Sequence, residues 1–67
     1  MEEARLYVGE KIIDTLALIG NNDSIDEITI NENGTMTVKY LRSTQIDDGE
    51  FVDVMHTTKG VTKISFK

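Results

Sequence analysis

The first third of the chain spaces its apolar residues in a way that predicts an amphipathic helix over residues 2–19. At about 100° per residue, the apolar side chains fall within one arc of about 180°. They are Leu6, Val8, Ile12, Ile13, Leu16, Ala17 and Ile19. Glu3, Glu10 and Asp14 fall together on the opposite side of this helix, within about 40°. Gly20 suits the position after a helix because glycine adopts the left-handed conformation cheaply, and residues 21–24 are then expected to form a loop.

After residue 25 the spacing of apolar residues changes from the helical period to a period of two residues. Apolar residues alternate with polar ones at residues 28–30, 36–40, 52–54 and 64–66, and many of them are β-branched. This alternation, bounded by turn residues, predicts four strands.

Three loops that end in glycine fix the expected strand register. They are residues 32–34, 47–49 and 58–60. A two-residue turn at Asn33-Gly34 would pair apolar with polar side chains. A three-residue loop ending at Gly34 instead pairs Ile30 with Met36 and Ile28 with Val38, which keeps each face of the sheet consistent.

The same argument applies to the other two loops. The loop at residues 47–49 pairs Tyr40 with His56, Leu41 with Met55 and Thr44 with Val52. The loop at residues 58–60 pairs Val54 with Ile64 and Val52 with Phe66.

These elements predict an α+β fold with a single domain over residues 1–67, in which one N-terminal helix packs on a four-stranded antiparallel meander. The expected core face of the sheet is Ile28, Ile30, Met36, Val38, Tyr40, Val52, Val54, Ile64 and Phe66.

Composition excludes several classes of protein. The 67 residues contain no Cys and one His, so disulfide frameworks, Cys-based zinc sites and multi-histidine metal sites are excluded. The apolar runs are too short to cross a bilayer, and the start MEEAR lacks the basic residues of a signal peptide. We therefore expect a cytoplasmic protein. The formal net charge of −5 argues against direct binding to nucleic acid or anionic membranes.

Some apolar residues remain after the core is assigned. Leu41, Phe51, Met55 and Val61 are expected to cluster on the outer face of the sheet, and Gly9 lies within the apolar arc of the helix. Because so short a chain buries little apolar surface, we expect these residues to form a homodimer interface.

Catalytic and metal sites are not indicated. His56 has no nucleophile placed beside it by any motif, and Asp47 and Asp48 are typical turn residues. Residues 21–26 resemble a calcium loop only superficially, since the alternating ligands, central glycine and distal glutamate are missing. We therefore expect a non-enzymatic protein without metal or cofactor.

Acidic residues are concentrated in two places. One is the helix stripe of Glu3, Glu10 and Asp14, and the other is a turn. The acidic residues of that turn are Asp47, Asp48, Glu50 and Asp53. Duplex DNA carries one phosphate charge about every 3.4 Å along each strand. One interpretation is a solvated surface that keeps a small protein soluble. The other is that carboxylates held in rows on a rigid scaffold, and repeated by a dimer axis, imitate the DNA backbone.

In these features the chain resembles small acidic phage proteins that take over host functions, in particular DNA mimics that inhibit the bacterial nucleoid protein HU. The resemblance implies an inhibitor that occupies the DNA-binding surface of a basic host protein, with the seven acidic residues named above as the binding surface. The alternative is a dimeric assembly module that docks through Leu41, Phe51 and Met55. A small enzyme or ligand binder is the third possibility, and the chain is too short to enclose a sizeable pocket.

Overall fold

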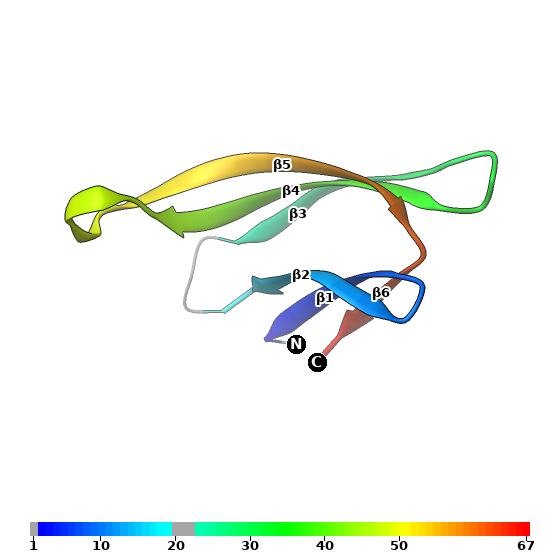
Figure 1. Cartoon of the computed structure of the whole chain (residues 1–67), viewed down its shortest axis with the longest axis horizontal. Helices are drawn as coiled ribbons and strands as arrows, with labels where there is room; N and C mark the ends of the chain where they lie inside the picture. Colours follow the sequence, from blue (N-terminus) through cyan, green and yellow to red (C-terminus); the bar gives the residue numbers. More distant parts are fainter. Residues whose placement is uncertain (1, 20–22) are drawn as a thin grey trace.

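The computed structural model describes residues 2–19 and 23–67, which form six strands and one short 3₁₀ turn. The strands are β1 (Glu3–Val8), β2 (Lys11–Ala17), β3 (Ser24–Ile30), β4 (Met36–Gln45), β5 (Phe51–Val61) and β6 (Lys63–Phe66), and the turn η1 is Asp47–Gly49. They make two three-stranded antiparallel sheets, ordered β2-β1-β6 and β3-β4-β5, which face each other (Figure 1). The predicted α+β fold is therefore wrong.

Residues 2–19 form a β-hairpin in place of the predicted helix. Val8 pairs with Lys11 across the two-residue turn Gly9-Glu10, and Gly9 has φ +62°, which glycine adopts without strain. The register shifts between Leu6 and Tyr7. This bulge leaves β2 with two adjacent isoleucines that also fit a broad helical arc. The predicted positions of Gly20, Asn21 and Asn22 lie outside the described residues.

Two of the three predicted hairpin registers are confirmed. In the β3–β4 hairpin Ile30 pairs with Met36 and Ile28 with Val38. The β4–β5 hairpin pairs Tyr40 with His56, Leu41 with Met55 and Thr44 with Val52. The rule that apolar residues share one face therefore selected the correct register in both hairpins.

The third predicted hairpin is wrong, because β5 continues through residues 58–60. Thr58 pairs with Val38 and Val61 with Met36, with a register shift between the two pairs. Gly60 has φ +78° at this irregularity, where the chain bends out of one sheet and into the other. After Thr62, whose backbone N–H donates to the Tyr7 carbonyl, β6 pairs with β1 and not with β5.

The core lies between the two sheets and is small. It comprises Ala4, Leu6, Leu16, Val38, Tyr40 and Val61, with Leu18, Ile25, Met36 and Ile64 packed around it. The predicted core face is only partly correct, since five of its residues are exposed. They are Ile28, Ile30, Val52, Val54 and Phe66. The first four lie in the longer β3-β4-β5 sheet, and the β2-β1-β6 sheet covers only the middle of it (Figure 1). Phe66 is the last residue of β6, in the smaller sheet.

One buried carboxylate joins the two sheets where β2 leads into β3. Asp23 accepts a hydrogen bond from the Ala17 backbone N–H at 2.9 Å and another from the Ser43 backbone N–H at 2.7 Å. Ala17 ends β2 and Ser43 lies in β4, so this side chain ties the first sheet to the second.

The molecule is elongated, with dimensions of 42 × 21 × 19 Å. Its radius of gyration is 12.5 Å, whereas a compact chain of this length would have about 11 Å. The excess arises because the β4–β5 hairpin extends beyond the smaller sheet (Figure 1). Within the described residues, no helix has the length and apolar character needed to cross a membrane.

Candidate functional site

The predicted acidic stripe of Glu3, Glu10 and Asp14 does not exist, because it required a helix. Glu3 lies at the start of β1 and forms an ion pair with Arg5. Glu10 lies in the exposed turn at the other end of β1. The structure therefore separates these two carboxylates along the length of a strand.

Asp14 faces the interior between the sheets, where it holds a polar network. Its Oδ2 accepts a hydrogen bond from the Tyr40 hydroxyl at 2.6 Å, and its Oδ1 accepts one from Arg42 Nη1 at 2.7 Å. The Tyr40 oxygen also lies 3.1 Å from the Thr58 hydroxyl. Burial raises the pKa of Tyr40, and the hydrogen bond to Asp14 raises it further. The carboxylate of Asp14 is therefore occupied within the fold and is not presented to a partner.

The other predicted acidic group lies at the end of the β4–β5 hairpin, which we name the hairpin tip and define as residues 45–55. Asp47, Asp48, Glu50 and Asp53 are all exposed there. The tip is closed by the Ile46 backbone N–H, which donates to the Glu50 carbonyl at 2.8 Å. Asp48 has φ +69°, a conformation that Asp and Asn tolerate better than most residues.

The charge of the hairpin tip is not balanced by nearby basic residues. No Lys or Arg occurs between Arg42 and Lys59 in the sequence. Arg42 is already paired with Asp14. The only polar contact of a tip carboxylate to another side chain, within the described residues, is from the Ser43 hydroxyl to Asp53 at 3.2 Å. The tip is thus a region of uncompensated negative charge at one end of an elongated molecule.

Exposed apolar side chains accompany these carboxylates. Phe51 is 65% exposed and Met55 is 47% exposed. Ile46, Val52 and Val54 are exposed as well. Sequence reasoning assigned Val52 and Val54 to the core, and so it missed them as surface residues. The available signal was the length of β4 and β5, which exceeds that of any segment able to cover them.

The residues predicted to form a dimer interface are not all exposed. Phe51 and Met55 are exposed, and Leu41 is half-buried opposite Met55. Val61, however, is fully buried. Its predicted place on the outer face is wrong because the side chain enters the core where β5 bends toward β6.

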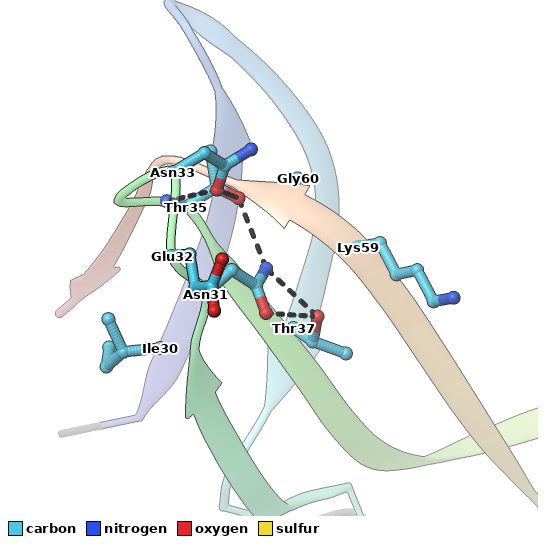
Figure 2. Close-up of a pocket in the computed structure, with 8 residues that line it drawn as sticks. All are labelled: Ile30, Asn31, Glu32, Asn33, Thr35, Thr37, Lys59 and Gly60. Carbon is cyan, nitrogen blue, oxygen red and sulfur yellow. Dashed lines mark hydrogen bonds between the residues drawn. The ribbon is translucent and has the colours of Figure 1, made fainter.

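A shallow polar depression lies at the turn between β3 and β4, at the end of the long sheet away from the hairpin tip (Figure 1 and Figure 2). Asn31 spans it, donating from Nδ2 to the hydroxyls of Thr35 and Thr37, both at 3.2 Å. Thr35 in turn donates to Asn33 Oδ1 at 2.7 Å. These polar groups satisfy one another, and their hydrogen bonds stabilise the turn between β3 and β4.

The single histidine, His56, packs against a core tyrosine. The His56 ring stacks on Tyr40 with 5.4 Å between ring centroids. Its Nε2 is buried and has no hydrogen-bond partner among the residues that the structure describes. Within residues 2–19 and 23–67, no three His, Asp or Glu side chains are grouped so that they could hold a metal ion.

Comparisons with known proteins add no identification: no family model, curated protein or solved structure matches this chain.

Proposed function

We propose that this chain is a non-enzymatic inhibitor that binds a basic DNA-binding protein through the hairpin tip and thereby excludes DNA. The observation that supports it is the segment between Arg42 and Lys59, which has four carboxylates and no Lys or Arg and protrudes at the tip of a hairpin. The binding residues are Asp47, Asp48, Glu50 and Asp53. The phage resemblance suggests the nucleoid protein HU as the partner and the bacterial cytoplasm as the location.

The physical basis of the proposal is electrostatic complementarity. A groove that binds DNA is lined by basic side chains, and it attracts any rigid array of negative charges. The hairpin holds its carboxylates in a fixed backbone frame, so little conformational entropy is lost on binding. Oppositely charged surfaces also associate rapidly, at a rate that falls with ionic strength.

The test is competition between the protein and duplex DNA for purified HU, followed by fluorescence anisotropy of labelled DNA. We expect the protein to displace DNA and the displacement to weaken as salt rises, because the screening length falls from about 10 Å at 0.1 M to about 3 Å at 1 M. A direct titration of HU with labelled inhibitor at each salt concentration separates this effect from the salt dependence of DNA binding.

A charge-matched pair of variants locates the surface. Asp47→Asn, Asp48→Asn and Glu50→Gln together remove three charges from the tip. Glu10→Gln, Glu27→Gln and Glu32→Gln remove three exposed charges elsewhere. We expect the tip variant to weaken inhibition by about tenfold or more and the control to weaken it little. Equal effects of the two variants would show that inhibition depends on net charge and not on the hairpin tip.

A second candidate function is docking of the outer sheet face onto another protein, favoured by the exposure of Phe51 and Met55 beside Leu41. Here Phe51→Ser with Met55→Ser would abolish partner binding, and amide substitutions at the tip would not. Loss of HU binding in the apolar variant alone would favour this alternative over electrostatic mimicry.

A further inference from the structure

We infer that β5 is also a self-association edge, at which a second copy of this chain adds its own β5 antiparallel about a two-fold axis. This inference concerns the chain alone. It shares Asp53 with the proposed binding surface, and in the dimer that surface would consist of Asp47, Asp48 and Glu50. It places the dimer contact on a strand edge and not on the outer sheet face of Leu41 and Met55.

The position of β5 in its sheet leaves one side of the strand open. β5 is the last strand in the order β3-β4-β5, and β6 belongs to the other sheet. Among the described residues, none forms a strand on the side of β5 away from β4. The backbone groups on that side are thus available to pair with another strand.

Residues 51–55 of β5 lack most of the features that normally protect an open edge, whereas Lys59 and the bulge at Gly60 lie at the other end of the strand. Phe51, Val52, Val54 and Met55 are all exposed, and they alternate over both faces of the strand. Asp53 is the only charged residue in the segment 51–55. Natural sheets usually protect such an edge with charges, proline or a covering segment, and a long apolar edge without them tends to pair with another chain.

The charges on β5 favour a second copy as the occupant and indicate its register. Like charges placed directly opposite each other are destabilising, which disfavours a two-fold axis at Asp53. An axis at His56 places Asp53 of each copy opposite Lys59 of the other. Lys59 and Asp53 both lie on the outer face, since Asp53 pairs with Ser43 and Lys59 lines the same depression as Thr37. One strand therefore carries both halves of the complementary pair.

An axis at Val54 or at Met55 would leave Asp53 opposite an uncharged residue, Met55 or Thr57 respectively. Of these registers, the axis at His56 alone forms two Asp53–Lys59 pairs, one on each side of the axis. In this arrangement the two β3-β4-β5 sheets join into one continuous sheet, and the two hairpin tips point in opposite directions.

The experiment is a charge-reversal series measured by sedimentation equilibrium on the purified chain without any partner protein. We expect the wild type to sediment at twice its chain mass of 7.5 kDa. Asp53→Lys alone, or Lys59→Asp alone, turns two attractive pairs into two repulsive ones and should weaken the dimer by about tenfold to a hundredfold. Both residues are exposed, and circular dichroism checks that each variant remains folded.

Two rescues distinguish paired charges from a general loss of stability. The double variant Asp53→Lys with Lys59→Asp should dimerise like the wild type. An equimolar mixture of the two single variants should form a heterodimer, because both charge pairs are then restored. Leu41→Ser, on the outer face, should leave the dimer intact.

Several outcomes would overturn the inference. A wild-type chain that stays monomeric at every concentration up to its solubility limit excludes the dimer. A dimer insensitive to both charge reversals, or weakened by them without rescue, excludes this edge and register. A dimer lost on Leu41→Ser but not on the charge reversals assigns the contact to the outer face. None of these results bears on HU binding, which the tip variants test separately.

Discussion

Replacing Asp14 with alanine tests whether this carboxylate serves the fold, as its contacts indicate. Asp14 accepts from the Tyr40 hydroxyl at 2.6 Å and from Arg42 at 2.7 Å. Hydrogen bonds to a charged group contribute about 1.5–3 kcal/mol each when they are shielded from water. The Tyr40 bond belongs in this range because the Tyr40 residue is only 2% exposed.

The Arg42 contact contributes less than the Tyr40 contact. The Arg42 side chain is 42% exposed, against 14% for Asp14. Solvent screening therefore reduces this pair to about 0.5–1 kcal/mol. Together the two contacts give an expected loss of about 2–3 kcal/mol in the free energy of unfolding, because Thr58 remains beside the Tyr40 hydroxyl. A domain of this size would lose about 10–20 °C in Tm.

Urea denaturation followed by far-ultraviolet circular dichroism measures this loss. Glu10→Ala is the matched control, since it removes an exposed acidic residue and should change stability by less than about 0.5 kcal/mol. A double-mutant cycle with Tyr40→Phe should show a coupling of about 1 kcal/mol or more. Surface substitutions usually change the free energy of unfolding by less than about 0.5 kcal/mol. If Asp14→Ala changes it by no more than this, the interior network contributes nothing and the reasoning fails.

Three further predictions concern the scaffold. Asp23→Ala should cost about 2–4 kcal/mol, because two backbone N–H groups lose a charged acceptor; a urea midpoint within error of the wild type would contradict this. Gly34→Ala should cost about 1–2 kcal/mol in the same assay, since Gly34 has φ +85° and open space around it, so strain is the only cost; an unchanged midpoint would show that the turn relaxes. Burial raises the pKa of Tyr40 above its ordinary value of 10.0, so its contribution to stability is complete below pH 10 and is lost as the pH rises from there through the folded-state pKa. Tyr40→Phe should therefore flatten the decline of Tm above pH 10, and an unchanged decline would assign it to other groups.

The part of the fold that was predicted correctly depends on local geometry. A glycine at a fixed loop position, together with the requirement that apolar residues share a face, was sufficient to place Ile30 opposite Met36 and Tyr40 opposite His56. Both requirements act within one hairpin, so a single sequence contains the information needed.

The N-terminal segment was predicted wrongly because the spacing of its apolar residues fits a helix as well as two strands. Residues 2–19 contain a bulge, and a bulge disrupts the alternation that would have indicated strands. Gly9 was the better signal, because a glycine inside a helix is unfavourable and a glycine in a two-residue turn is not. Gly60 was ambiguous for another reason: a left-handed residue serves a hairpin loop and a bend between sheets equally well.

The candidate site was predictable where it is sequential and unpredictable where it is not. Asp47, Asp48, Glu50 and Asp53 are close in the chain, and their clustering at one exposed end follows from the hairpin alone. The engagement of Asp14 by Arg42 depends on two sheets facing each other, which no local pattern indicates.

The two ends of the described chain are held together by backbone hydrogen bonds. The Glu3 N–H donates to the Lys67 carbonyl at 3.0 Å, and the Lys67 N–H donates to the Glu3 carbonyl at 2.9 Å. Any segment fused beyond either end therefore leaves from the same corner of the small sheet, remote from residues 45–55. An affinity tag or fluorophore at either end should leave the acidic hairpin free. A circular permutant that joins these ends and opens the chain at Gly49 should keep every strand pairing while cutting the proposed contact surface in two.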